Sequence, residues 1–293
     1  MPKLPTEILD SPFYLYSSAD DAKKGAPFGG TGFFVGYPTG LTEPKFFTYA
    51  ITNWHVAVRD GASVIRVNKA GGGVDIFEFD PAEWFFVPGG HDVAIVSGTH
   101  LPVNASHLVR AIDTRLFLTK DDVAEFSIGA GEDIFMLGRF VDHDGGVQNV
   151  PAARFGNLSV MPQPIEQPTG AKNLSSFILD VHSRTGYSGS PVFVYRTYGS
   201  DLSTANLNIE KKSHFMKVLG LHWGQFPEAW EIESGKTLSV EGASISGDAK
   251  YVKGMSGMTL AIPSWDILKY LEMPKFQQER AAKLEAIQKR QAV

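Results

Sequence analysis

The sequence predicts an all-β protein made of two β units in tandem, and three observations support this fold class. Short apolar or alternating runs recur between turn residues, 30 Gly and 17 Pro occur in 293 residues, and helical spacing appears only from residue 264 onward. With 43% hydrophobic and 20% charged residues, the chain has an ordinary globular composition and enough length to bury a large core.

The two β units are read from the order of these runs. The first unit has runs at 29–38, 45–58, 63–70, 75–81 and 92–98. The second unit begins near residue 133 and continues through "PAARFGNLSV", "SSFILDVHS", "SPVFVY" and "MKVLGLHWG". Evenly spaced strands with turn signals indicate a β-barrel or a sandwich.

Two segments interrupt this rhythm. Residues 196–214 and 225–257 are polar, rich in Gly and Ser, and too long for hairpin turns. Long loops in compact domains are commonly functional or mobile, so we expect lids or partner-responsive elements there.

The C-terminal segment is expected to be helical. Ser264 is the expected N-cap, and Pro274 should break or kink the helix. Beyond Pro274 the chain is charged, with Leu284 and Ile287 as its main apolar positions. We expect a solvated terminal helix there; an oligomer contact is the alternative.

Composition excludes several classes of function. A formal charge of −5 without an extended basic run argues against nucleic acid, and the absence of Cys excludes disulfides, thiolate metal sites and a cysteine nucleophile. We find no His-Glu-x-x-His arrangement, so neither a metal nor an organic cofactor is expected. No apolar stretch spans a bilayer and no leader is visible, which favours a cytoplasmic location without membrane partners; a leader removed upstream would leave secretion open.

Three residues stand in contexts that suit a nucleophilic hydrolase. His55 lies in "TNWHVAV", Asp92 begins "DVAIV", and Ser188 lies in "GYSGSPVF". Taken singly, each has an ordinary explanation, as a structural histidine, a strand start and a turn serine. Together they supply a hydroxyl, an imidazole to accept its proton and a carboxylate to orient the imidazole.

In this order, the three segments resemble the catalytic motifs of the chymotrypsin/trypsin-like serine peptidases. The similarity extends over roughly residues 25–272 and includes "GTGFFVG", "VLGLHWG" and "GMTLAIPSWDILKYL". It implies two six-stranded Greek-key β-barrels, at about 25–118 and 125–262, and a C-terminal helix from 264. An N-terminal extension (1–24) and a charged helical tail (273–293) would flank this domain.

The resemblance also implies roles for individual residues. His55 would be the general base, Asp92 its orienting carboxylate and Ser188 the nucleophile of a serine endopeptidase that acts on protein or peptide substrates. The backbone N–H groups of Gly186 and Ser188 would form the oxyanion hole. An α/β-hydrolase elbow is the competing serine-hydrolase interpretation, but "GYSGS" departs from Gly-x-Ser-x-Gly and regular β-α alternation is missing.

Within this family, "HWG" is most similar to the bacterial glutamyl endopeptidases. The resemblance places His222 and Ser183 against an acidic P1 side chain, the residue before the scissile bond, with Trp223 and Gly224 on the substrate-binding strand. An imidazolium and a hydroxyl would hold its carboxylate; His222 packing beside Trp223 is the alternative.

Tyr187 replaces the aspartate of secreted trypsins, so activation by a new N-terminus is not expected. A latent or inactive protease-like binding module, and an unidentified regulatory partner, remain open.

Overall fold

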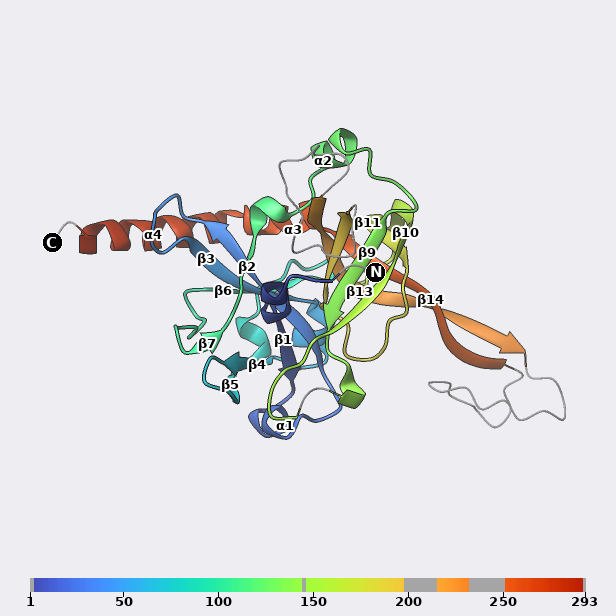
Figure 1. Ribbon diagram of the computed structural model, residues 1–293, viewed down its shortest axis with the longest axis horizontal. Coiled ribbons are helices and arrows are strands. Elements are labelled where there is room, and N and C mark those ends of the chain that lie inside the picture. Colours follow the sequence, from blue (N-terminus) through green and yellow to red (C-terminus); the bar gives the residue numbers. More distant parts are fainter. Residues whose placement is uncertain (1–2, 144–145, 198–214, 232–250, 292–293) are drawn as a thin grey trace.

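Two β-barrels lie side by side in the computed structural model, which describes residues 3–143, 146–197, 215–231 and 251–291 (Figure 1). Two helices follow the second barrel at the C-terminal end. The all-β fold class with tandem barrels and a C-terminal helix is confirmed.

The first barrel contains eight strands and several short helices. Its hydrogen-bonded path runs β5–β4–β1–β2–β3–β6, and the short strands β7 and β8 pair with β4 and β2. The strands are β1 Pro12–Tyr16, β2 Gly30–Pro38, β3 Phe46–Thr52, β4 Val64–Lys69, β5 Val74–Phe77, β6 Ala94–Ser97, β7 His107–Leu108 and β8 Ile112–Asp113. The helical turns are η1 Thr6–Asp10, α1 Ala19–Lys24, η2 His55–Arg59, η3 Pro81–Glu83 and η4 Thr114–Leu116.

The N-terminal segment belongs to this barrel, so the expected domain start at residue 25 is wrong. Strand β1 pairs with β2 on one side and with β4 on the other, and all five of its residues are buried. Its sequence, "PFYLY", is too short and too uniformly apolar to distinguish a buried strand from another apolar segment. Only its pairing with β2 and β4 identifies it as a strand of this barrel.

The second barrel is closed, in the order β10–β11–β14–β13–β12–β9. Helix α2 Lys120–Glu125 precedes it, and the short helix η5 Val141–His143 follows its first strand. Its strands are β9 Asp133–Gly138, β10 Ala152–Ile165, β11 Leu174–Asp180, β12 Pro191–Arg196, β13 Phe215–Glu231 and β14 Tyr251–Pro263.

The described parts of the segment 225–257, which was expected to be a loop, are strands: residues 225–231 end β13 and residues 251–257 begin β14. Strands β13 and β14 pair as far as Glu231 and Tyr251, and this two-stranded ribbon projects from the barrel (Figure 1). A ribbon that leaves the barrel packs on no shared core, so its sequence carries no clear apolar alternation. Residues 232–250 of this segment, and residues 198–214 of the other expected loop, lie outside the described residues.

The C-terminal segment forms two helices, α3 Ser264–Leu271 and α4 Pro274–Gln291, so the break at Pro274 is confirmed. Ser264 is wrong as the N-cap: it is the first helical residue, and its Oγ donates to Leu118 O (2.7 Å). The tail is also more than a solvated helix. Phe276 is fully buried against Tyr49 and Phe85, with ring centroids 5.5 and 5.0 Å away.

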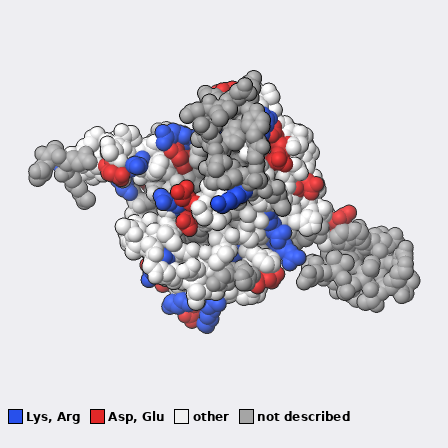
Figure 2. Space-filling view, in the orientation of Figure 1, with Lys and Arg blue, Asp and Glu red and all other residues white. Residues whose placement is uncertain are grey.

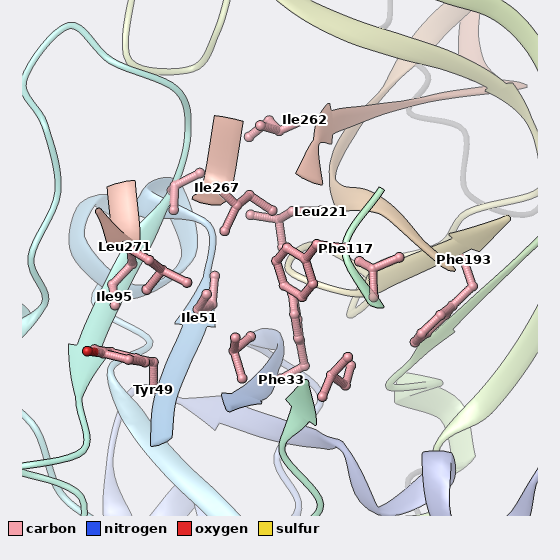
Figure 3. Close-up of a cluster of buried hydrophobic side chains, with 14 of the residues drawn as sticks. Phe33, Tyr49, Ile51, Ile95, Phe117, Phe193, Leu221, Ile262, Ile267 and Leu271 are labelled. Atoms are coloured by element: carbon pink, nitrogen blue, oxygen red, sulfur yellow. The ribbon is translucent and has the colours of Figure 1, made fainter. Parts of the chain in front are cut away.

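One hydrophobic cluster joins the two barrels and α3. Figure 3 shows Phe33 and Ile51 of the first barrel facing Leu221 and Ile262 of the second, with Ile267 between them. This shared core fixes the cleft between the barrels. On the visible surface, acidic and basic residues are interspersed (Figure 2). None of the helices that the structure describes is long and apolar enough to cross a membrane.

Candidate active site

His55 and Asp92 are brought together across the first barrel. His55 begins the π-helical turn η2 directly after β3, while Asp92 lies just before β6, the neighbouring strand. The His55 Nδ1 and Asp92 Oδ2 atoms are 2.5 Å apart, and the His55 N–H donates to Asp92 Oδ1 (2.8 Å). The carboxylate is fully buried and the imidazole is 12% exposed. A hydrogen on Nδ1 held in this way leaves Nε2 as the basic nitrogen.

The short turn that carries Asp92 is held by the loop between β10 and β11 of the second barrel and by α3. Thr169 Oγ1 donates to Gly90 O (2.7 Å), and the N–H of His91 donates to the Tyr270 hydroxyl (2.7 Å). The N–H of Asp92 itself donates to Gln167 Oε1 (3.4 Å). The orientation of the carboxylate therefore depends on the packing of both barrels.

Ser188 lies on the wall of the same pocket as His55. This active-site pocket has a volume of about 450 Å³, and Ser183, Gly186 and Gln225 also line it. Among the described residues no hydrogen bond joins His55 Nε2 to Ser188 Oγ. Such bonds are often long without substrate and tighten when it binds.

The backbone around Ser188 leaves two N–H groups available. Among the described residues, Tyr187 N–H donates to Arg184 O and Gly189 N–H to His222 O, but Gly186 N–H and Ser188 N–H have no protein acceptor. Both of these residues line the active-site pocket. Two free N–H groups beside a nucleophile are what an oxyanion hole requires.

Thr31 of β2 binds two carbonyl groups of the loop that carries Ser188. The Thr31 hydroxyl donates to Gly186 O (2.6 Å), and the Thr31 N–H donates to Ser188 O (2.8 Å). The carbonyls are thus turned into the protein, away from the pocket. Gly189 (φ +89°) makes this close approach possible, because a Cβ there would lie 1.8 Å from Thr31 O.

Tyr187 anchors the loop on its other side. Its ring is fully buried in the core of the second barrel, and its hydroxyl donates to Ala152 O (3.3 Å). Burial raises the pKa of this hydroxyl, which therefore stays protonated at neutral pH. A buried aromatic ring therefore stands at the position where secreted trypsins have the aspartate that pairs with a new N-terminus.

Ser183 and His222 form a second hydroxyl–imidazole pair. Ser183 Oγ and His222 Nε2 are 2.7 Å apart, and His222 Nδ1 is 3.1 Å from Leu260 O. Burial lowers the pKa of His222 to about 4, outweighing the carbonyl of Leu260, which raises it. The expected imidazolium is therefore wrong for the free protein at neutral pH: His222 is neutral, donates from Nδ1 and accepts from Ser183.

Trp223 and Gly224 lie where β13 leaves β12. Strand β13 pairs with β12 only as far as Leu221, and a register shift against β14 falls between His222 and Gly224. Trp223 points into the core, where its Nε1 donates to Ser176 Oγ (3.0 Å), so its ring does not face the pocket. Beyond His222, β13 still pairs with β14, but its other edge pairs with no described strand. An extended peptide could pair with that edge.

Three residues of this site were not predicted from the sequence: Thr31, Gln167 and Gln225. Thr31 appears only as the residue between glycines in "GGTGFF", and Gln167 lies in a turn without a motif. Gln225 lines the active-site pocket, and its buried Oε1 has no partner among the described residues. Only the position of Thr31 in the early "GTGFFVG" strand gave any signal.

Comparison with known proteins identifies the fold. No protein-family model and no curated protein matches the chain. Among solved structures, the protease domain of MamO from Magnetospirillum magneticum is similar, with a TM-score of 0.50 and 14% identity. The alignment covers 92% of this chain and 100% of that one. At this identity the likeness shows the fold, the two-barrel fold of the chymotrypsin-like proteases.

Two further structures were found at lower TM-scores. The Rv3671c protease in an inactive form gives 0.46 at 17% identity, covering 91% of this chain and 88% of its own. The HtrA-type protease AlgW with a decapeptide gives 0.42 at 16% identity, covering 83% and 50%.

Proposed function

We propose that this protein is a serine endopeptidase. In the reaction, His55 takes the proton of Ser188 as its Oγ attacks the peptide carbonyl, and then gives that proton to the leaving amine. Asp92 holds the imidazole and stabilises its cation, while the N–H groups of Gly186 and Ser188 receive the oxyanion. Water then hydrolyses the acyl-enzyme by the same steps.

One observation carries this proposal. The 2.5 Å contact between His55 Nδ1 and Asp92 Oδ2 lies beside a pocket that also contains Ser188 and two unpaired backbone N–H groups. A structural histidine would explain the contact with Asp92. It would not explain why the nucleophile and the free donors share its pocket.

Labelling with a fluorophosphonate probe tests the proposal. Mass spectrometry should find the adduct on Ser188 in the wild type and none in Ser188→Ala, with Ser106→Ala at an exposed serine as the matched control. Peptide hydrolysis should fall by about a million-fold in Ser188→Ala. A folded wild type whose Ser188 stays unlabelled contradicts the proposal and favours a protease-like binding module.

The finer part of the proposal concerns the substrate: the P1 side chain is Glu or Asp. Ser183 lines the active-site pocket with His222 directly behind it, and Arg184 lines the same pocket. Because His222 is neutral at pH 7, its contribution to holding a carboxylate requires protonation. The preference that depends on His222 should therefore grow as the pH falls.

Two peptides that differ only in Glu or Gln at P1 test this specificity. The ratio of their kcat/KM values cancels the ionisation of His55. From pH 8 to pH 5 the Glu/Gln ratio should rise, because the protonated fraction of His222 grows about tenfold per pH unit above its pKa. The His222→Gln variant should lose this rise; a flat ratio in the wild type would contradict the role of His222.

A further inference from the structure

A second pocket lies against α3 and shares no lining residue with the active-site pocket. This α3 pocket has a volume of about 430 Å³ and is lined by His91, Lys120, Met161, Trp265 and Asp266, among others. Its walls come from the turn before β6 and from α2, β10, β11 and α3. It adjoins the catalytic carboxylate through the chain itself, because His91 directly precedes Asp92.

The His91 ring presents a buried donor that no described residue satisfies. Its backbone N–H donates to the Tyr270 hydroxyl, whose own hydrogen is then available to His91 Nδ1 (3.2 Å). The ring hydrogen accordingly belongs on Nε2. That atom is buried without a hydrogen-bond partner, and the nearest carboxylate oxygen, Asp266 Oδ2, is 3.7 Å away. An unpaired buried donor is costly and indicates an acceptor that arrives from outside.

The charges around the α3 pocket favour an anion. Asp266 is already paired, since its Oδ1 lies 2.6 Å from Lys269 Nζ. The exposed Lys120 then leaves the lining with one net positive charge. Burial also lowers the pKa of His91, against the effect of Asp266, so the ring serves as a neutral donor.

Apart from Asn173 and Ser175, the remaining lining is apolar. Val123, Met161, Leu174 and Trp265 provide an aliphatic, thioether and aromatic surface. We propose that the α3 pocket binds a small carboxylate with an aromatic or aliphatic body. The carboxylate accepts from His91 Nε2 and pairs with Lys120, while the body packs on Trp265.

Such a ligand is coupled to the catalytic pair. It bridges the His91 ring to α3, and His91 is one peptide away from the carboxylate that orients His55. Because hydrogen bonds with Thr169, Tyr270 and Gln167 help to place the turn at 90–92, an added contact at His91 shifts the Asp92 carboxylate.

Calorimetry with 4-phenylbutyrate tests the site, with 4-phenylbutanol as the ligand without a carboxylate. Binding to the wild type should be at least tenfold tighter for the acid than for the alcohol. It should weaken at least tenfold in His91→Phe and in Lys120→Met, which changes an exposed side chain and should fold. Lys172→Met, an exposed lysine outside the pocket, should bind as the wild type. No binding, or equal binding to all four proteins, overturns the proposal.

Proton NMR tests the coupling without any need for turnover, so it stands even if the protein is not a protease. The acid should shift the low-field His55 Nδ1 resonance in the wild type and leave it unchanged in Lys120→Met at the same concentration. Binding without a shift of this resonance overturns the coupling.

Discussion

The two sides of the active-site pocket each hold a histidine with a close oxygen partner, yet the two histidines are in opposite situations. On the first-barrel side, His55 meets the buried carboxylate of Asp92 and lies at the pocket. On the second-barrel side, His222 meets the hydroxyl of Ser183 and the carbonyl of Leu260, and burial holds its pKa at about 4.

The difference shows that the partner, rather than burial alone, decides what an imidazole can do. A carboxylate stabilises the cation that forms when a base accepts a proton, whereas the Leu260 carbonyl raises the pKa of His222 too little to outweigh burial. The first side can therefore carry proton transfer. The second side offers shape and hydrogen bonds, and gains charge only in acid.

Among changes that compare the two histidines, the largest effect is expected from removing the charge on the first-barrel side. Asp92→Asn should lower kcat by about ten-thousandfold, because an amide presents a donor to His55 and favours the wrong tautomer. Steady-state peptide hydrolysis measures this change. Asp75→Asn, which alters another Asp–His contact of the same barrel (Asp75 with His107, 3.0 Å), is the matched control. A tenfold loss or less in Asp92→Asn would remove the distinction between the two histidines.

A smaller effect is expected from the pH dependence of His222. Its pKa is about 4 in the folded protein, against 6.5 in the unfolded chain. As the pH falls through this window, the unfolded chain takes up a proton that the folded protein does not. The free energy of unfolding should then fall by about 3 kcal/mol from this residue. Urea unfolding between pH 7 and 4.5 should show a flatter profile for His222→Gln, and an unchanged one for the exposed His100→Gln.

The loop between the two sides should respond next. Thr31→Val keeps the shape of the side chain but removes the hydroxyl that holds Gly186 O, leaving that buried carbonyl unpaired at a cost of about 1–3 kcal/mol. We expect kcat to fall about tenfold to a hundredfold with little change in KM, and Thr31→Ser to restore it. A loss in Thr31→Ser with none in Thr31→Val would mean that the methyl group, not the hydroxyl, is needed.

The smallest effect is expected at Tyr187. Tyr187→Phe loses the 3.3 Å bond to Ala152 O and the interaction of the hydroxyl with Arg154, so the free energy of unfolding should drop by about 0.5–1.5 kcal/mol while kcat stays within twofold. Thermal unfolding and peptide hydrolysis measure the two quantities. A tenfold loss of kcat in Tyr187→Phe would show that the hydroxyl, in addition to the buried ring, positions the loop that carries Gly186 and Ser188.

The parts of this protein that were predictable from sequence are those with a local signature. Turn residues between apolar runs indicated the two β units, and Pro274 marked the break between α3 and α4 because proline cannot continue a helix. The residue types around His55, Asp92 and Ser188 indicated the site, since proton transfer to and from a hydroxyl requires those chemical groups. The roles assigned to them remain predictions until the labelling experiment.

What the tertiary structure alone decided depends on contacts between distant segments. The strand at Pro12–Tyr16, the burial of Phe276 and the bond from Thr31 to the loop of Gly186 each need a partner that lies tens of residues away or more. The neutral state of His222 is of the same kind. An imidazole in a sequence has an ordinary pKa, and only the packing around it determines how much water it loses and which of its forms is hydrogen-bonded.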